Sequence, residues 1–231
     1  MFLDPRYFLF MLPGLALMLL AQWRLRSAFS KYRQVRNSRG LTGAQAAAAV
    51  MRAAGVYDVA IEPIPGELTD HFDPRQRVLR LSEPVYASNS IAAIGVAAHE
   101  AGHAVQQHVG YAPMAFRTGL VPVVNFGSTL GIIVIIAGLF LQFQGLAWIG
   151  VLLFATTTLF ALITLPVEYD ASARARQLLE ESGLVTREEY DGVRTMLNAA
   201  AYTYVASFAA SFLTLLYYVM LVSGMGGRRR D

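Results

Sequence analysis

The fold is decided by residues 118–167, which read TGLVPVVNFGSTLGIIVIIAGLFLQFQGLAWIGVLLFATTTLFALITLPV. These 50 consecutive residues contain no Asp, Glu, Lys or Arg. A helix that crosses a hydrocarbon core of about 30 Å needs about 20 mostly apolar residues, so the run is long enough for two such helices. The polar interruption between them is Gln142-Phe143-Gln144-Gly145. We therefore expect a transmembrane hairpin over 118–166.

Two further apolar stretches lie outside this run, at residues 7–23 and 202–222, and each is a candidate membrane span. The first is not expected to be a signal peptide, because Asp4 precedes it and Gln22-Trp23-Arg24 is a poor cleavage site. Of all 231 residues, 55% are hydrophobic and 15% are charged, against about 25% charged in an average soluble domain. The sequence therefore predicts a mainly α membrane protein with four transmembrane helices.

The distribution of Lys and Arg predicts the orientation, because these residues favour the cytoplasmic side. With four spans, segments 24–117 and 168–201 share one side and carry eleven and four of them. The other side carries Arg6 and the terminal triplet Arg228, Arg229 and Arg230. We expect a multi-pass protein of the cell membrane whose two long polar segments are cytoplasmic, although the terminal triplet runs against this orientation.

Segment 24–117 has the pattern of a small α+β domain. Thr42 is a plausible N-cap for an Ala-rich helix that ends near Ala54, and Ser90 caps a longer helix that ends near Gly110. Alternation predicts strands over 56–62 and 77–81, with a loop over 63–74. We expect the strand over 77–81 to bind extended peptide along its edge.

Segment 167–201 is expected to be helical and to contribute to the same site. A helix is predicted to begin at Glu168 and to end before Gly183, and Thr186 with Glu189 forms a capping box that begins another helix.

The helix after Ser90 carries the sequence that points to chemistry, His99-Glu100-Ala101-Gly102-His103. In this H-E-x-x-H pattern the two histidines lie one turn apart on one helix face and can bind the same tetrahedral cation. The glutamate lies beside the metal and can take a proton from a water molecule that the metal activates. Imidazole ligands suit zinc, and the chain has no cysteine to offer. The flanking residues 91–98 are small and apolar, which favours a buried and therefore occupied site.

A catalytic zinc ion with two histidine ligands needs a third protein ligand. Glu168 is the best candidate, because two spans return the chain to the side it left, near the helix that carries the histidines. His71 is the next candidate, whereas His108 lies about 140° round the helix from His103 and faces away. Asp170 is a candidate hydrogen-bond partner for a ligating imidazole.

A second polar cluster comprises Asp70, His71 and Asp73, and it has two interpretations. These side chains can orient substrate, donate to a developing oxyanion or bind a second ion; alternatively, Asp73 caps a turn before Pro74. Tyr202 and Tyr204 can also stabilise an oxyanion, but aromatic residues are common at a membrane boundary for other reasons.

Several blocks of the chain resemble the YugP family of membrane-bound neutral zinc metallopeptidases, over nearly its whole length. The blocks are Gly66-Glu67-Leu68-Thr69-Asp70-His71-Phe72-Asp73-Pro74, Val78-Leu79-Arg80-Leu81-Ser82, Val96-Ala97-Ala98-His99-Glu100-Ala101-Gly102-His103-Ala104-Val105-Gln106, Thr164-Leu165-Pro166-Val167-Glu168-Tyr169-Asp170-Ala171-Ser172 and Ala199-Ala200-Ala201-Tyr202-Thr203-Tyr204-Val205-Ala206. The resemblance implies an integral membrane metalloprotease with a zincin-like domain, in which His99 and His103 bind one zinc ion and Glu100 is the catalytic base.

The order of motifs is also similar to that of the HtpX-type membrane proteases, in which a membrane hairpin separates the histidine pair from a glutamate ligand. By that similarity Glu168 is the third ligand. Many glutamate-zincins carry an aspartate four residues after this glutamate, and here that position is Ser172 while the acid is Asp170.

The predicted function is hydrolysis of peptide bonds in peptide or membrane-protein substrates, with one Zn2+ ion as cofactor and the lipid bilayer as partner. The sequence shows no basic patch with interleaved aromatic residues, so we expect no nucleic acid among its partners. Two alternatives stay open: a membrane scaffold or quality-control factor that holds zinc without turnover, and a transporter. Glu100 argues against the first, and the charge-free hairpin argues against the second.

Overall fold

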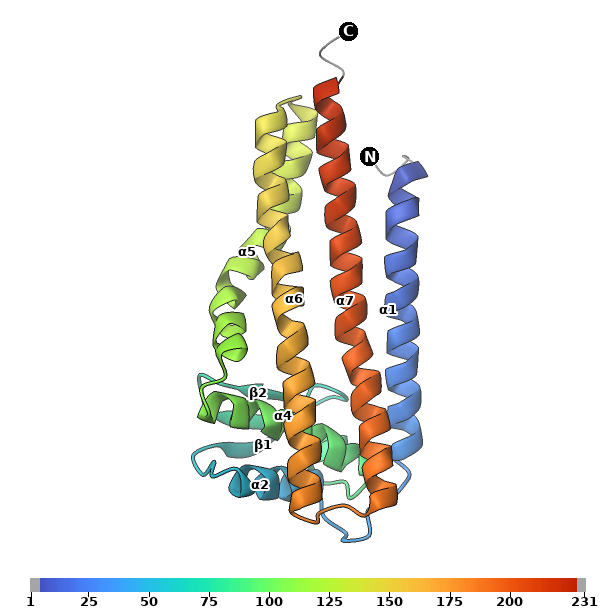
Figure 1. The fold of residues 1–231 in the computed structure, drawn as a ribbon, viewed down its shortest axis with the longest axis vertical. Coiled ribbons are helices and arrows are strands. Elements are labelled where there is room, and N and C mark those ends of the chain that lie inside the picture. The colour runs from blue at the N-terminus through green and yellow to red at the C-terminus, as the bar shows by residue number, and fades with distance from the viewer. Residues whose placement is uncertain (1–4, 228–231) are drawn as a thin grey trace. The chain divides into compact units, whose positions relative to one another are not determined.

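The structure, a computed structural model, describes residues 5–227, so the arginine triplet 228–230 lies outside the described residues. The chain divides into two compact units (Figure 1). Among the described residues, the first unit comprises 5–21, 116–165 and 203–227, and the second comprises 22–115 and 166–202. In chain order the elements are α1 (Pro5–Tyr32), α2 (Gly43–Ala53), β1 (Ala60–Ile64), β2 (His71–Asp73), β3 (Val78–Ser82), α3 (Glu83–Tyr86), α4 (Ile91–His108), α5 (Ala112–Phe140), α6 (Gln144–Glu181) and α7 (Arg187–Gly227).

Four helices of the described chain, α1, α5, α6 and α7, are long and apolar enough to cross a membrane. Between 11% and 28% of the residues in their apolar windows are buried, so most of these residues are partly or fully exposed. Leu9, Phe126 and Phe140 are 71%, 76% and 86% exposed. Large apolar side chains exposed in this number are typical of helices surrounded by lipid. The predicted class, mainly α with four apolar helices of membrane length, is confirmed.

Glycine residues allow α5 and the first part of α6 to approach each other closely. A Cβ atom on Gly138 would lie 2.4 Å from the backbone nitrogen of Ala147, and one on Gly150 would lie 2.5 Å from that of Ile135. Small residues at such contacts let helix backbones meet where lipid supplies no hydrophobic driving force. The two helices are joined at 141–143, where Gln142 has a φ of 53°.

The second unit contains a three-stranded sheet with the order β1-β3-β2, in which β3 pairs parallel to β1 and antiparallel to β2. Two expectations from the sequence are wrong here. The segment 63–74 is not all loop, because β2 forms within it and is only three residues long. The strand near 77–81 has no free edge, because β3 is the central strand; the edges of this sheet belong to β1 and β2.

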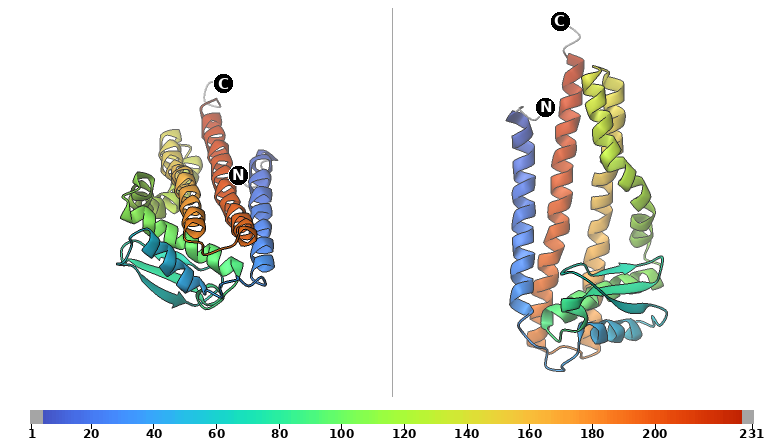
Figure 2. Two further views of the ribbon diagram at one scale, coloured as in Figure 1. Left: turned by 60° about the horizontal axis from the view of Figure 1, so that its bottom comes forward. Right: turned by 180° about the vertical axis from the view of Figure 1, so that it is seen from behind.

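The α4 helix lies along one side of this sheet (Figure 2). Its N-terminus is capped by Ser90, whose hydroxyl accepts a hydrogen bond from the backbone N–H of Ala93, as predicted. Phe72, Leu79 and Leu81 belong to the buried cluster that also contains the alanine-rich surface of α4. The small side chains of α4 permit close packing on every side, so the polar residues of this helix are held deep in the unit.

The α6 helix continues through Pro166 without interruption. The expectation that a helix begins at Glu168 is therefore wrong, because Glu168 lies inside a helix that started at Gln144. Val167 and Ala171 are fully buried, and this packing holds the backbone in the helical conformation beyond the proline. Tertiary packing here outweighs the local preference of proline for a helix start.

Candidate metal centre

His99 and His103 project from one face of α4 into the interior of the second unit. The two side chains are one helical turn apart, and their ring centroids are separated by 4.9 Å at an angle of 81°. They are 8% and 5% exposed. Two imidazoles buried side by side need a partner that compensates for their loss of water.

That partner is Glu168, which reaches the histidines from α6. Its Oε2 atom lies 3.1 Å from Nε2 of His99 and 3.5 Å from Nε2 of His103, and the residue is 1% exposed. The potential ligand atoms of the three residues all lie within 4.8 Å of one another. The structure thus brings together the three residues that the sequence nominated as ligands, although Glu168 is 65 positions after His103 in the chain.

A glycine between the histidines permits this approach of α4 to α6. A Cβ atom on Gly102 would lie 2.5 Å from the backbone oxygen of Ala171, closer than real Cβ atoms come to such an atom. The glycine therefore sets the distance between the helix that carries the two imidazoles and the helix that carries the carboxylate.

The Nδ1 atom of His103 lies 2.9 Å from Oε1 of Gln106, a fully buried residue. The Nε2 atom of Gln106 donates to the backbone oxygen of Val167 at 2.7 Å and to Oδ2 of Asp170 at 2.8 Å. These two acceptors fix the orientation of the amide, so its oxygen faces the imidazole and Nδ1 of His103 carries the proton. In the neutral imidazole the lone pair is therefore on Nε2, the nitrogen that faces Glu168; when Nε2 is protonated, it donates to the Glu168 carboxylate instead.

The Nδ1 atom of His99 lies 3.0 Å from the hydroxyl oxygen of Ser172, one helical turn beyond Glu168 on α6. An Nδ1–H that donates to this oxygen leaves Nε2 of His99 with its lone pair as well. With a metal ion bound, Gln106 and Ser172 would each accept from an Nδ1–H and so hold the imidazoles in the form that binds the ion through Nε2.

Sequence reasoning assigned no role to Gln106 or Ser172, and it expected Asp170 to contact an imidazole directly. Asp170 instead accepts from Gln106 and from Nε of Arg174, the latter at 2.6 Å. The signals were present in the spacing, because Gln106 is three residues after one ligand and Ser172 is four residues after another. Each position is one turn along the same helix face.

The electrostatics of the group favour a positive charge at its centre. Burial acts to lower the pKa of His103, but the hydrogen bond to Glu168 and the negative charges of Glu168 and Glu100 outweigh it and raise that pKa above 6.5. Two imidazole nitrogens and one carboxylate oxygen form a donor set that suits zinc and leaves a fourth position for water. The residues present therefore fit a zinc ion.

Glu100 follows His99 in the chain and is half-buried. Its charge acts on both His103 and Asp70. Within the described part of the chain, Glu100 makes no hydrogen bond or ion pair, so its carboxylate is available to a water molecule. This is the condition that a general base must meet.

Asp70 precedes β2 and is hydrogen-bonded to Ser82, the last residue of β3. It accepts hydrogen bonds from the backbone N–H of Ser82 at 2.7 Å and from the Ser82 hydroxyl at 2.9 Å. Burial raises the pKa of Asp70, although the bonds from Ser82 oppose the change. Its carboxylate holds the sheet together near Glu100.

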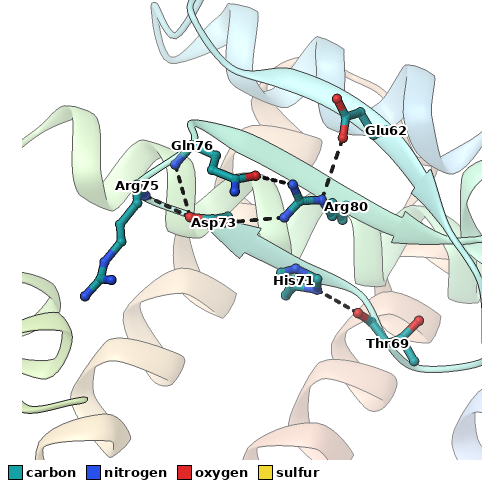
Figure 3. Close-up of polar contacts among 7 residues, drawn as sticks. All are labelled: Glu62, Thr69, His71, Asp73, Arg75, Gln76 and Arg80. Carbon is teal, nitrogen blue, oxygen red and sulfur yellow. Dashed lines mark hydrogen bonds and ion pairs between the residues drawn. The ribbon is translucent and has the colours of Figure 1, made fainter. Parts of the chain in front are cut away.

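His71 and Asp73 lie on the face of the sheet that is turned away from α4, because Phe72 between them is buried in the core (Figure 3). The Nδ1–H of His71 donates to the backbone oxygen of Thr69 at 2.9 Å. Asp73 accepts from the backbone N–H groups of Gln76 and Arg75, which lower its pKa. This is the turn that the sequence offered as the alternative to a functional role.

The remaining candidates also lie apart from the three buried ligands. Tyr202 is half exposed, and the guanidinium of Arg24 lies 5.1 Å from the centroid of its ring. His108 is exposed at the end of α4, as the helical spacing predicted.

Comparison with known proteins gives the family. A model of the family described as "Putative neutral zinc metallopeptidase" matches residues 7–223. The chain is 45% identical over 208 residues to the "Putative membrane protease YugP" of Bacillus subtilis (strain 168), and the alignment covers 90% of this chain and 92% of that protein. No solved structure matches. The chain, with its buried pair of histidines and glutamate, therefore belongs to the family that carries this description, "Putative neutral zinc metallopeptidase".

Proposed function

We propose that this protein is an integral membrane zinc metallopeptidase that hydrolyses peptide bonds. His99, His103 and Glu168 would hold one zinc ion. The observation that carries the proposal is the convergence of these three buried side chains, with their ligand atoms within 4.8 Å of one another. A group of this kind buried without a cation would keep an imidazole pair and a carboxylate out of water at considerable cost.

When bound, zinc lowers the pKa of a water molecule and polarises the carbonyl of the scissile peptide. Glu100 would act as the base, taking a proton from the attacking water and delivering it to the nitrogen of the leaving amine. Gln106 and Ser172 orient the imidazoles so that each Nε2 atom points at the position the ion would occupy. The chain thus provides a base and an ordered ligand set, which a site with a purely structural ion does not need.

We place the second unit, with the metal centre, on the cytoplasmic side of the membrane. The support is the number of Lys and Arg residues, because segments 24–117 and 168–201 together carry 15 of the 19. The substrates are peptides or segments of membrane proteins that reach a site close to the bilayer.

The function is tested by replacing the base while keeping the ligands. The variant Glu100→Gln should retain zinc but lose about 10²- to 10⁴-fold in the hydrolysis rate of a casein or membrane-protein substrate. Glu180→Gln is the matched control, because Glu180 is an exposed carboxylate on α6. Equal activity of Glu100→Gln and wild type would remove the proposed base. If the zinc-loaded wild type hydrolyses no substrate, the result would favour the alternative function, a metal-binding scaffold.

The ligand set is tested separately by elemental analysis of purified protein. Wild type should contain one zinc ion per chain, and Glu168→Ala should contain markedly less. Full zinc occupancy in this variant would show that Glu168 is not the third ligand.

A further inference from the structure

A second site lies away from the metal centre, where α1 and α7 line a cavity of about 420 Å³ within the second unit. One side is formed by Arg24, Ser27 and Lys31 of α1, which recur at intervals of three and four residues and so share one helix face. The other side is formed by α7, from Arg194 to Tyr202. Neither helix has another assigned role at this point.

The lining of this cavity is positively charged. It contains Arg24, Lys31 and Arg194, and no acidic residue. Arg194 makes an exposed ion pair with Asp191 at 3.5 Å. Within the described chain, Arg24 and Lys31 have no carboxylate partner; each cation instead lies 5.1 Å from the centroid of an aromatic ring, those of Tyr202 and Tyr32 respectively. Two cations that face one cavity without a counter-ion create a positive potential that favours binding of an anionic ligand.

The side chains between the cations suit a phosphate group in particular. Ser27 and Asn198 offer hydrogen-bond donors beside Arg24, and guanidinium is a preferred partner of phosphate oxygens. A phosphodiester carries one negative charge and several acceptor oxygens, so it can use the cations and the neutral donors together.

The position of the cavity along its helices identifies the source of the phosphate. Trp23 and Tyr202 both line it, and they stand at the ends of the apolar stretches 7–23 and 202–222. Trp23 is 65% exposed. Trp and Tyr are typical of the depth at which lipid head groups lie. A lipid whose phosphate sits beside Arg24 is therefore at the depth of its own head group, with its acyl chains in the bilayer.

We propose that this cavity binds the head group of an anionic phospholipid. The site is distinct from the metal centre and does not depend on the peptidase activity. It also differs from a diffuse attraction between basic residues and the membrane surface, because only the cations that face the cavity contribute to it. Arg26 provides the comparison, since it lies on the same helix two residues from Arg24, is exposed, and does not line the cavity.

The test uses the full-length protein in lipid nanodiscs and the fluorescence of Trp23. The variant Trp148→Phe removes the other tryptophan, since the chain has two. Phosphatidylglycerol with brominated acyl chains, at a low mole fraction in phosphatidylcholine, should quench Trp23 more than brominated phosphatidylcholine at the same fraction. A Lys or Arg near an anionic lipid contributes about 1 kcal/mol, so Arg24→Gln in this background should reduce the preference for the anionic lipid about fivefold. Arg26→Gln should leave it nearly unchanged.

Three results would overturn the proposal. Equal quenching by the two brominated lipids would show that the site has no anionic preference. Equal losses in Arg24→Gln and Arg26→Gln would show a diffuse charge effect rather than a site. The third result comes from a competition experiment, in which inorganic phosphate or glycerol phosphate is added at millimolar concentration to nanodiscs that contain brominated phosphatidylglycerol. We expect that neither compound relieves the quenching of Trp23. Relief by either would assign the cavity to a soluble phosphate compound instead of a lipid.

Discussion

Oε1 of Gln106 lies 2.9 Å from Nδ1 of His103, and the rest of the Gln106 amide is committed to acceptors on α6. The orientation of one metal ligand on α4 is therefore set by the helix that provides the third ligand. Replacement of Gln106 disturbs the tautomer of His103 without removing any atom that binds zinc.

The variant Gln106→Ala should weaken zinc binding by about 10- to 100-fold, the usual cost of losing a partner of a ligating histidine. The affinity is measured by competition with a chromophoric zinc chelator. Gln107→Ala is the matched control, because Gln107 is the next residue on α4 and its side chain is exposed and bonds to the backbone oxygen of Pro74. Equal affinities of Gln106→Ala and wild type would show that the amide does not position His103.

Removing the hydroxyl of Ser172 should also weaken zinc binding, because the Nδ1–H of His99 then loses its acceptor in a buried site. Ser172→Ala should reduce the affinity about tenfold. Ser172→Thr restores a hydroxyl and should recover most of the loss, which separates the hydrogen bond from a change in packing. An unaltered affinity in Ser172→Ala would contradict the role of this residue.

Zinc affinity should decrease as the pH falls, since the ion requires unprotonated imidazole nitrogens. In the metal-free protein the pKa of His103 is raised above 6.5, so protons compete with zinc at a higher pH than for an ordinary histidine. Above the raised pKa the imidazole is neutral and the full affinity is present; below it the affinity is progressively lost. Zinc titrations between pH 5 and pH 9 check this prediction, and a constant affinity down to pH 6 would contradict it.

The variant Gly102→Ala should separate α4 from α6, because the added Cβ atom would lie 2.5 Å from the backbone oxygen of Ala171. We expect a loss of about 1–3 kcal/mol in the free energy of unfolding, together with reduced zinc content. Thermal unfolding in detergent and elemental analysis measure the two effects. Gly119→Ala is the control, since its Cβ atom would meet no heavy atom within 4 Å; comparable behaviour of the two variants would exclude the steric explanation.

The sequence predicted those parts of the molecule that depend on local patterns. Ser90 and Thr42 cap the helices expected after them, Thr186 and Glu189 form the expected capping box, and the four long apolar stretches are helical. Each signal lies within a few residues of its effect. The spacing of His99 and His103 is of the same kind, because the geometry of a single helix fixes it.

The sequence was less informative wherever distant segments decide the structure. The three-residue strand β2 exists because β3 lies beside it, and its residues alone resemble a turn. Pro166 suggested a helix boundary, but burial of Val167 and Ala171 keeps α6 continuous. The spacing places Gln106 one turn from His103, but it does not reveal the acceptors on α6 that orient the Gln106 amide.

The division of the chain into units limits how the protein can be produced. Each of α1, α5, α6 and α7 belongs to the first unit over part of its length and to the second unit over the rest. Deleting the apolar segments to obtain a water-soluble fragment would cut all four helices and would leave residues 115 and 166 to be joined artificially. Glu168 would then sit at a new chain junction instead of inside a long helix, so expression trials should retain the apolar segments and use detergent or nanodiscs.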